Sequence, residues 1–314
     1  MKIGIVGNGS IVVYALQCFK EAGIECSALW CRTESKGKAV YDGPVYTDYA
    51  EFLKQDFDTV YIGLSNSLHY AYTLEALKAK KNAIVEKPFT DTYAQAKELV
   101  DVAKEEKVFL FEAIMSRYDP VYRKMPEYLQ KVGNLKLIQC NFSQYSSRYD
   151  AYKEKKVLPA FDPALGGGAL RDLNVYNIHF VAGLLGKPES VSYTCNTGFN
   201  GVDTSGTLVL QYPTCIAVCT AAKDSRSSSG ILVQGDEGTI EIHSRPGVLR
   251  SVTVNNEEIP CSSEQPMVLE FKAMQDVIEA KDYDICNRWM EQTLIVTEIL
   301  EQATPYTLNF VEFV

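Results

Sequence analysis

The first 112 residues alternate between short apolar runs and helical patterns, and this alternation restricts the fold more than any other feature of the chain. The apolar runs are Ile3–Val6, Ala28–Trp30, Val60–Leu64, Ala83–Val85 and Val108–Phe111. Helical stretches separate several of them, as crossover connections between parallel strands require. The pattern therefore predicts a parallel, doubly wound sheet.

Two positions in this region carry signals for the beginning of a helix. Ser10 is a residue type that caps helices, and it precedes helical apolar spacing that includes Phe19, so we predict a helix that is capped by Ser10 and stops at Gly23. Thr92 and Gln95 have the spacing of a capping box, in which the Gln95 side chain reaches back to the start of the helix.

After Asp119-Pro120, strand patterns follow one another with only short turns between them. A predicted helix near Val121–Lys131 leads to the extended runs Leu135–Tyr145, Val191–Thr197, Thr207–Gln211, Ile216–Ala222, Ile231–Gly235, Thr239–His243 and Val248–Val254. Two helices, about Met267–Ala280 and Asn287–Gln302, follow. Short turns between strands are typical of antiparallel sheets. We predict a doubly wound domain over residues 1–118 and an α+β domain with a large, mainly antiparallel sheet over residues 119–314.

Charge and cysteine spacing exclude several classes of function. The 314 residues include 31 Lys and Arg against 40 Asp and Glu, for a formal net charge of -9. Nucleic-acid binding relies on clustered basic residues, so this balance argues against it. The cysteines form no C-x-x-C pair and the histidines are scattered, so no metal site is expected. Unpaired cysteines, a strand that begins at Lys2, and the lack of an apolar run of about 18 residues predict a cytoplasmic protein with no membrane contact.

A glycine turn joins the first predicted strand to the first predicted helix and reads Gly7-Asn8-Gly9-Ser10-Ile11-Val12. Gly7 permits the tight turn, and Gly9 lets a pyrophosphate approach the backbone amides at the helix N-terminus. Val12 stands where a Rossmann motif has its third glycine, which implies slightly wider packing between helix and strand. The turn predicts a dinucleotide site in a Rossmann domain; the alternative is a plain glycine turn.

The end of the second strand bears on the choice between NADP and NAD. It lacks the Asp or Glu that would accept hydrogen bonds from a ribose 2′-hydroxyl. Arg32 can instead form a charge-assisted fork to a 2′-phosphate, with help from Thr33 and Lys36. We predict NADP, with NAD possible; the alternative makes Arg32 a solvated loop residue.

Three further segments resemble the glucose–fructose oxidoreductase/inositol dehydrogenase (Gfo/Idh/MocA) family. They are Asp58–His69, Ala83–Pro88, which contains Glu-Lys-Pro, and the glycine-rich Gly166–Asp172. The likeness runs from residue 1 to about residue 190. It implies an NAD(P)-dependent dehydrogenase or reductase acting on CH–OH groups, with a homodimer formed through the C-terminal sheet.

By position, the resemblance makes Lys87 the catalytic lysine, placed beside the nicotinamide and the reacting carbon. An ammonium there polarises a carbonyl or stabilises an alkoxide. Glu86 would orient it, and Pro88 fixes the backbone direction after the strand. The resemblance also places Ser65, Asn66 and His69 beside the cofactor, although a capping or packing role for His69 is an alternative.

The segment Asp172–His179 provides the remaining catalytic candidates. Asp172 and Tyr176 are four residues apart, hence one turn apart on one face of a predicted helix. The resemblance to the glucose–fructose oxidoreductase and dihydrodiol dehydrogenase branch makes Tyr176 the proton donor or acceptor and Asp172 a substrate-orienting carboxylate. A nearby ammonium such as Lys87 would lower the phenol pKa from its reference value near 10. The alternative makes Tyr176 one more aromatic of an amphipathic helix.

Two other positions in this segment depart from the family pattern. Asn174 replaces a glycine that is usual there, so a close backbone approach is less expected. His179 falls on the same helical face as Asp172 and could contact substrate or take over proton transfer. A buried, hydrogen-bonded histidine is the alternative for His179.

Arginines complete the predicted site. Arg117 matches a family arginine at the domain junction, where it could bind cofactor or substrate, or staple the hinge. Arg148, in a polar and aromatic segment with Tyr145 and Tyr149, suits a sugar or polyol; the alternative is an ordinary exposed loop. The prediction is hydride transfer between NADP(H) and a carbonyl or alcohol of a sugar, polyol or cyclic diol. The alternatives are a non-catalytic dinucleotide-binding regulator and a redox-neutral enzyme with tightly bound NAD.

Overall fold

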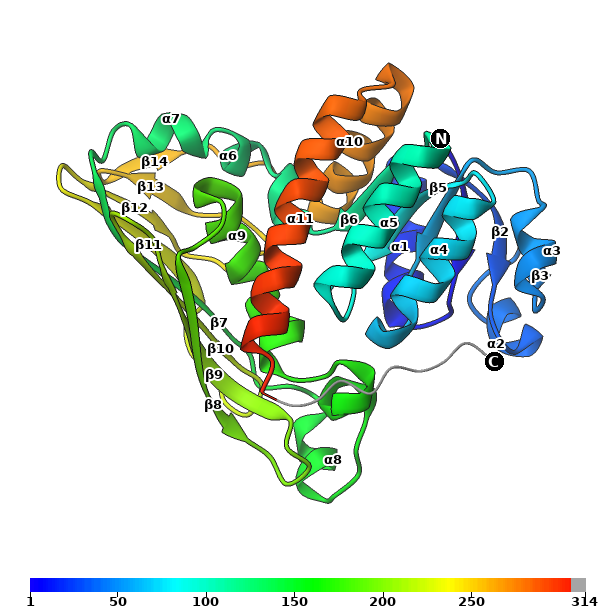
Figure 1. Cartoon of the computed structure of the whole chain (residues 1–314), viewed down its shortest axis with the longest axis horizontal. Coiled ribbons are helices and arrows are strands. Elements are labelled where there is room, and N and C mark those ends of the chain that lie inside the picture. The colour runs from blue at the N-terminus through cyan, green and yellow to red at the C-terminus, as the bar shows by residue number, and fades with distance from the viewer. Residues whose placement is uncertain (306–314) are drawn as a thin grey trace. The chain divides into compact units, whose positions relative to one another are not determined.

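A computed structural model describes residues 1–305 and divides the chain into two compact units (Figure 1). Unit 1 holds Met1–Ala113 and Met267–Leu294, and unit 2 holds residues 114–266 together with the described residues from Ile295 onward. The predicted division after residue 118 differs from these units mainly in one segment. Met267–Leu294, predicted to belong to the second domain, is part of unit 1.

Unit 1 is built on a six-stranded sheet in the order β3-β2-β1-β4-β5-β6, in which every pair is parallel. The strands are β1 (Lys2–Val6), β2 (Glu25–Trp30), β3 (Val45–Tyr46), β4 (Thr59–Ile62), β5 (Asn82–Glu86) and β6 (Leu110–Ala113). The doubly wound prediction is confirmed. β3 was not predicted, since two residues are too few for a periodic signal.

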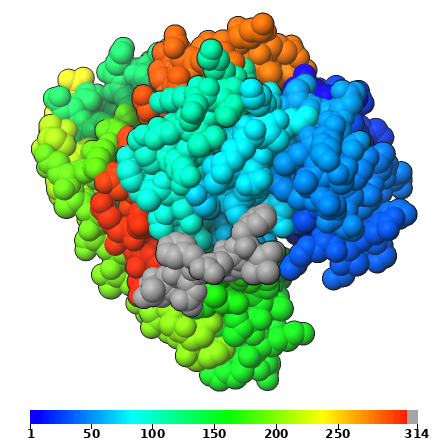
Figure 2. All heavy atoms as spheres, turned by 45° about the vertical axis from the view of Figure 1, so that its right-hand side comes forward, coloured from blue at the N-terminus to red at the C-terminus, as the bar shows by residue number. Residues whose placement is uncertain are grey.

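The helices between these strands are α1 (Ser10–Glu21), α2 (Glu34–Lys38), α3 (Tyr49–Leu53), α4 (His69–Lys78) and α5 (Tyr93–Glu106). In the space-filling view, α4 and α5, coloured cyan to teal, form much of the visible surface of unit 1 (Figure 2). Two later helices are α10 (Pro266–Ala280) and α11 (Tyr283–Ala303); the residues of α11 from Ile295 onward belong to unit 2. Phe271 of α10 stacks on Phe19 of α1 with ring centroids 3.9 Å apart, so the late segment contributes directly to the core of unit 1.

The helix caps differ in part from the prediction. Gly9, with extended backbone, is the N-cap of α1 and Ser10 is its first helical residue, so the prediction that Ser10 caps the helix was wrong. Thr92 does cap α5, and its hydroxyl accepts a hydrogen bond from the Gln95 amide. The Gln95 side chain, however, accepts from the Asp91 amide and not from that of Thr92. The hydrogen bond from the backbone to the Gln95 side chain is thus shifted by one residue, from Thr92 to Asp91, relative to a standard capping box.

Unit 2 is built on an eight-stranded sheet in the order β14-β13-β12-β11-β7-β10-β9-β8. The strands are β7 (Leu135–Ser143), β8 (Ser190–Thr197), β9 (Asp203–Gln211), β10 (Ile216–Ala222), β11 (Gly230–Gly235), β12 (Thr239–Ile242), β13 (Val252–Val254) and β14 (Glu257–Ile259). Only β7 and β10 pair in parallel within this sheet of the described chain, so the prediction of a mainly antiparallel sheet is confirmed.

Helical segments of unit 2 are mostly short. They are the 3-10 turn Met115–Tyr118, α6 (Pro120–Arg123), α7 (Met125–Leu129), α8 (Tyr149–Lys153), the 3-10 turns Pro159–Phe161 and Pro163–Leu165, the π-helical turn Leu170–Asn174, and α9 (Val175–Leu185). The single helix predicted near Val121–Lys131 is therefore two helices. Pro126 lacks the N–H that would donate to the carbonyl of Tyr122 in a continuous helix, and its ring would clash with that carbonyl, which explains the break at Lys124. None of the helices in residues 1–305 combines the length and apolarity needed to cross a membrane.

Candidate active site

The glycine turn of unit 1 has the geometry that a dinucleotide requires. Gly7 has a φ of +118°, and a Cβ there would lie 2.5 Å from the carbonyl oxygen of Gly63. At Gly9, a Cβ would meet no heavy atom within 4 Å, so open space lies in front of the N-terminus of α1. The backbone amides at that end of the helix can therefore be reached by an anionic group such as pyrophosphate.

Val12, in place of the third glycine, is fully buried, and the structure shows what accommodates it. A Cβ built on Gly63 would lie 2.8 Å from Cγ2 of Val12. Gly63 follows β4 directly, and its amide donates to Val6 of β1. Gly63, 51 positions after Val12 in the sequence, thus leaves the space that the Val12 side chain occupies.

Arg32 lies at the end of β2, exposed to solvent. Its guanidinium makes no hydrogen bond or ion pair within residues 1–305. The acid closest in sequence, Glu34, is paired with Lys38 instead. Burial raises the pKa of the Tyr72 phenol, and the positive charge of Arg32 partly opposes that shift. The exposed charge suits a 2′-phosphate. Thr33 is the N-cap of α2, and Lys36 is exposed within that helix.

Glu86 ends β5 and is 6% exposed, while Lys87 directly after it is half-buried. The hydroxyl of Tyr61, on the adjacent strand β4, donates to Oε1 of Glu86 at 2.8 Å. Burial raises the pKa of the Glu86 carboxyl, and the Tyr61 hydrogen bond and the charge of Lys87 oppose that shift. Tyr61 was not predicted as a site residue because it reads as part of an apolar strand.

His69 is fully buried at the start of α4. Its Nδ1 lies 2.9 Å from the carbonyl oxygen of Pro88 and its Nε2 lies 3.2 Å from that of Leu64. Burial lowers the pKa of the ring, while the two carbonyls oppose the shift. With both nitrogens facing the backbone, His69 clamps the turn after β5 to the turn after β4, which favours the packing role over cofactor contact. Ser65 and Asn66 are half-buried in the same turn after β4.

In unit 2, the glycine-rich segment before α9 is shaped by Asp203. Gly168 has a φ of +116°, and a side chain there would collide with the Asp203 carboxylate. That carboxylate, fully buried, accepts from the Leu170 amide at 2.6 Å and from the Tyr193 hydroxyl at 2.7 Å. The helical segment therefore begins at a fixed point against β9 and β8.

Asp172 and Tyr176, predicted to share one face of an α-helix, lie in two different kinds of helix. Asp172 lies in the π-helical turn Leu170–Asn174 and Tyr176 lies in α9. They are therefore not separated by one regular α-helical turn, and the predicted α-helical spacing was wrong. π-helical turns are inserted where a helix must change the direction of its side chains, frequently at functional sites.

Asp172 is paired with Lys223, a residue that the sequence did not single out. Nζ of Lys223 lies 2.8 Å from Oδ2 of Asp172 and 2.6 Å from the carbonyl oxygen of Ala160, which it also donates to. The ammonium sits 4.7 Å from the centre of the Phe161 ring. Side-chain exposure is 2% for Lys223 and 39% for Asp172, so one carboxylate edge faces the ammonium while the residue remains accessible.

Asn174, which replaces the family glycine, has a structural role. Its Nδ2 donates to the Cys219 carbonyl at 2.9 Å, and its Oδ1 accepts from Nδ2 of Asn177 at 2.7 Å. Asn177 also donates to the Thr220 carbonyl. Because Cys219 and Thr220 belong to β10, the two asparagines fasten the π-helical turn and α9 to the sheet.

Tyr176 is half-buried, with its ring 5.7 Å from that of Phe142 on β7. A Cβ on Gly247 would lie 3.0 Å from the Tyr176 ring, so the glycine lets that loop cover one face of the phenol. These contacts hold the Tyr176 ring in place. That is compatible both with a proton-transfer role and with a packing role.

The remaining candidates differ in exposure. His179 is 1% exposed, which favours a buried histidine over substrate contact, and its backbone carbonyl accepts from the Tyr122 hydroxyl. Arg117 is 4% exposed, and its charge opposes the burial that raises the pKa of Tyr122. Arg148 is exposed, and its guanidinium has no hydrogen bond or ion pair in the described chain, so the structure does not bring it onto Asp172 or Tyr176.

Comparison with known proteins finds a family match in each of the two units. Residues 1–114 match the GFO_IDH_MocA model, described as an oxidoreductase family with an NAD-binding Rossmann fold. Residues 122–241 match the GFO/IDH/MocA C-terminal domain.

Two curated relatives align over most of the chain. The scyllo-inositol 2-dehydrogenase (NADP(+)) IolU of Bacillus subtilis is 30% identical over 270 residues, covering 82% of this chain and 80% of the relative. The trans-1,2-dihydrobenzene-1,2-diol dehydrogenase of Xenopus tropicalis is 33% identical over 270 residues, covering 82% and 79%. Among solved structures, a 3-ketoreductase from Actinomadura kijaniata in complex with NADP and TDP-benzene has a TM-score of 0.83 at 20% identity, covering 96% of each chain. That likeness concerns the fold.

Proposed function

The chain belongs to the GFO/IDH/MocA family of oxidoreductases, and on that premise we propose that it transfers hydride between NADP(H) and a carbonyl or alcohol carbon of a sugar, polyol or cyclic diol. The related inositol and dihydrobenzenediol dehydrogenases act on hydroxyl-bearing rings, which supports this substrate class. The observation that carries the proposal is Lys87 at the carboxyl end of β5, where open α/β sheets bind ligands.

The residues of unit 1 fit a dinucleotide phosphate. The amides of Gly9, Ser10 and Ile11 would hold the pyrophosphate at the N-terminus of α1, beside Asn8. Arg32 would bind the 2′-phosphate, with Thr33 beside it. Ser65 and Asn66 follow β4 at the same edge of the sheet. When bound, the cofactor supplies or accepts the hydride.

The proposed chemistry assigns roles to Lys87, Tyr176 and Asp172. In the oxidation direction, with NADP+ bound as the hydride acceptor, Tyr176 would act as base and take the proton of the substrate hydroxyl as the carbinol becomes a carbonyl. Lys87 stabilises the negative charge that grows on the oxygen. Asp172, held on one edge by Lys223, would orient a substrate hydroxyl with its accessible edge. Arg117 and Arg148 are the remaining candidate substrate or cofactor contacts.

The proposal is tested with a spectrophotometric screen of polyols, aldoses and cyclic diols, run with NADP+ and NAD+ in parallel. We expect turnover with at least one substrate class and NADP+. In Tyr176→Phe, loss of acid–base catalysis should lower kcat by about 10²- to 10⁴-fold, with NADP affinity unchanged. Tyr128→Phe is the matched control, because that phenol has no hydrogen bond within the described chain.

Two results would count against the proposal. Cofactor binding with no turnover on any substrate would favour a dinucleotide-binding regulator. A Tyr176→Phe enzyme whose turnover matches that of the wild type across pH would remove the acid–base role while leaving the oxidoreductase assignment in place.

Cofactor preference is tested by Arg32→Ala. Loss of the charge-assisted contact to the 2′-phosphate should weaken NADP binding by about tenfold or more, and leave NAD binding nearly unchanged. Titration calorimetry with both nucleotides measures the ratio. An unchanged ratio of NADP to NAD affinity would mean that Arg32 is only a solvated loop residue.

A further inference from the structure

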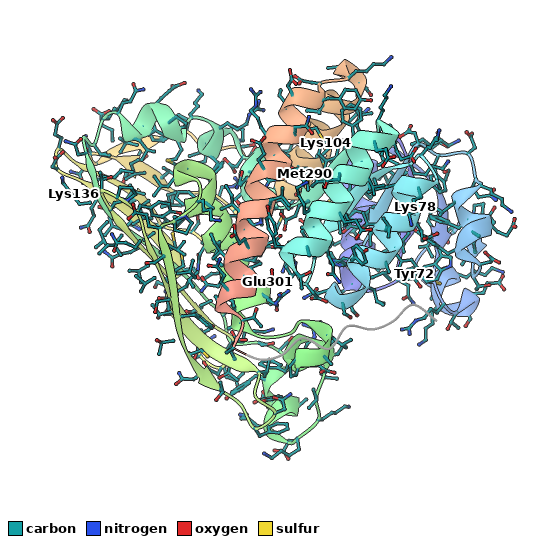
Figure 3. All side chains as sticks on the ribbon, in the orientation of Figure 1. Tyr72, Lys78, Lys104, Lys136, Met290 and Glu301 are labelled. Atoms are coloured by element: carbon teal, nitrogen blue, oxygen red, sulfur yellow. The ribbon has the colours of Figure 1, made fainter. Side chains whose placement is uncertain are left out.

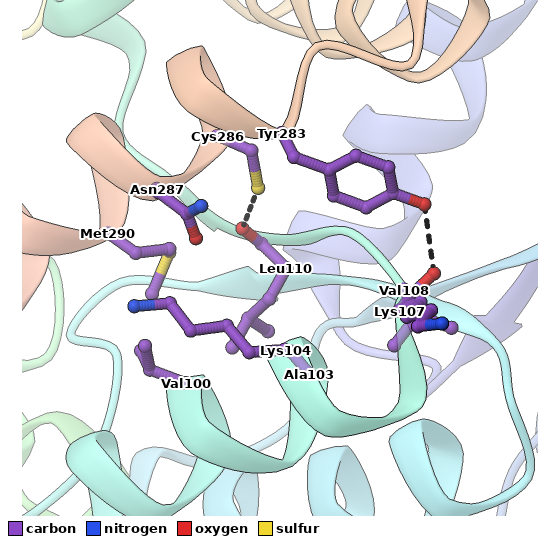
Figure 4. Close-up of a pocket in the computed structure, with 10 residues that line it drawn as sticks. All are labelled: Val100, Ala103, Lys104, Lys107, Val108, Leu110, Tyr283, Cys286, Asn287 and Met290. Atoms are coloured by element: carbon purple, nitrogen blue, oxygen red, sulfur yellow. Dashed lines mark hydrogen bonds between the residues drawn. The ribbon is translucent and has the colours of Figure 1, made fainter.

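Unit 1 contains a cavity that none of the residues assigned above enters. It lies between α5, the loop before β6 and the first turns of α11, and has a volume of about 310 Å³ (Figure 4). Its lining residues are Val100, Ala103, Lys104, Lys107, Val108, Leu110, Tyr283, Cys286, Asn287 and Met290. Ligand pockets for small molecules begin at about this size.

The cavity lies at the opposite edge of the parallel sheet from the cofactor residues. Val108 precedes β6 and Leu110 begins it, so the cavity is at the amino end of that strand. Gly7 and Lys87 follow the carboxyl ends of β1 and β5. Because all six strands are parallel, these ends form opposite edges, and the cavity is separate from the nucleotide site.

Two hydrogen bonds fix the walls of the cavity. The Tyr283 hydroxyl donates to the carbonyl of Lys107 at 2.9 Å, and Sγ of Cys286 donates to the carbonyl of Leu110 at 3.3 Å (Figure 4). The Tyr283 ring also stacks on Phe109 at 4.3 Å. The start of α11 is thereby held against the loop that joins α5 to β6, which gives a preformed cavity instead of a gap between mobile elements.

Three polar side chains line this otherwise apolar cavity without a partner of their own. The ammonium groups of Lys104 and Lys107 form no ion pair within residues 1–305, and the half-buried Asn287 amide makes no hydrogen bond there. Lys104 of α5 and Met290 of α11 are labelled in Figure 3. In a chain of net charge -9, two unpaired lysines at one apolar cavity are a local anion-attracting feature.

We propose that this cavity binds a small amphipathic carboxylate. Its apolar body would lie against Val100, Leu110 and Met290. Its carboxylate would accept a charge-assisted hydrogen bond from Lys104, whose side chain extends toward Met290, with the Asn287 amide as a further donor, while Lys107 adds positive charge at the other end of the cavity (Figure 4). Two cations select for an anion, and the apolar walls select for a flat or short hydrocarbon body.

The probe for this site is 2-naphthoate, measured by ligand-detected NMR titration on the full-length protein, with and without NADP+. 2-Naphthalenemethanol, which has the same apolar body without the charge, is the second probe. We expect 2-naphthoate to bind whether or not NADP+ is present, and to bind about tenfold or more tightly than the alcohol. Displacement of 2-naphthoate by NADP+ would overturn the proposal, because the probe would then occupy the nucleotide site.

Variants test the lysines and the volume separately. Lys104→Gln with Lys107→Gln should weaken 2-naphthoate binding by about tenfold and leave the alcohol unaffected. Lys78→Gln, an exposed and unpaired lysine on α4, is the matched control and should change nothing (Figure 3). Ala103→Phe should abolish binding of both probes by filling the cavity, with circular dichroism as the check on folding. Equal binding of the two probes, or undiminished binding in the double lysine variant, would show that no carboxylate site exists here.

Discussion

Glu86 is a carboxylic acid that unit 1 encloses almost completely, with the Tyr61 hydroxyl as its hydrogen-bond donor. Its pKa is raised by burial, so the folded state binds the proton more tightly than the unfolded state does. Stability is therefore lost as pH rises from the ordinary carboxyl range through the raised pKa of Glu86. The Tyr61 hydrogen bond reduces this loss because it favours the ionised form.

Tyr61→Phe should consequently destabilise the protein in a pH-dependent manner. At a pH above the raised pKa of Glu86, removal of the donor to the buried carboxylate should lower the free energy of unfolding by about 1–3 kcal/mol. Below about pH 4, Glu86 is protonated in both states and the difference between variant and wild type should shrink. Urea unfolding at several pH values measures both quantities.

Tyr49→Phe is the matched control for this experiment. The Tyr49 hydroxyl donates to the carbonyl of Tyr72, a neutral acceptor, at 2.8 Å. Its loss should lower stability by a similar amount at every pH. If the two variants show the same pH dependence, Tyr61 does not act through the charge of Glu86.

For individual residues, the sequence predicts some of the site residues but not the side chains that hold them in place. Lys87 and Arg32 are recognisable because they lie beside strand ends within local motifs. Tyr61, Lys223 and Asp203 are not, because their partners lie 25, 51 and 33 positions away in the chain. His69 and Asn174 carry local motif signals, but only the fold shows that both are fully buried against backbone carbonyls.

The packing of α1 on the central strands combines a large residue, Val12, with a facing residue that has no side chain, Gly63. Gly63→Ala should lower the free energy of unfolding by about 1–3 kcal/mol, because the new methyl group would overpack against Val12. Val12→Ala should also destabilise, through the cavity that it leaves. In the double variant, the space vacated by Val12 receives the Gly63→Ala methyl group.

A double-mutant cycle by urea unfolding measures this exchange. The double variant should be less destabilised than the sum of the single variants, with a coupling of about 0.5–3 kcal/mol. Additive effects would show that Val12 and Gly63 do not determine one another's size.

Elements with strong periodicity were predicted well, and their ends were predicted less well. The parallel order of unit 1 follows from repeated strand and helix patterns, whereas the start of α1 depends on the extended backbone of Gly9. The π-helical turn Leu170–Asn174 has no signal of its own in the sequence. It arises where the segment is held by Asp203 on β9 at one end and by β10 through Asn174 at the other.

For the whole molecule, the face of the eight-stranded sheet that carries Val209 is the proposed dimer interface. Val209 and Ile216 are 36% and 39% exposed, and Val209 is paired with Val218 across β9 and β10. The opposite face, which includes Leu208 and Ala217, is buried in the core of unit 2. Exposed apolar side chains on one face of a sheet are suited to self-association about a twofold axis.

We therefore predict a homodimer by light scattering at micromolar concentration. Val209→Glu combined with Ile216→Glu should shift it to the monomer, because four carboxylates would be buried in a twofold interface. Gln130→Glu, at an exposed position just after α7, is the control and should remain dimeric. A monomeric wild type would refute the prediction.

The late position of Met267–Leu294 in the chain has a consequence for biosynthesis. A ribosome releases residues 1–113 first, before any of α10 or α11 has been made. At that stage Phe19 lacks Phe271, its stacking partner, and Glu112 lacks the Thr293 hydroxyl that donates to it at 2.7 Å. The nucleotide-binding half is thus begun before unit 2 but completed only after residues 114–266 of that unit, and the nascent chain must keep its unfinished apolar surface from aggregating until α10 and α11 have been translated.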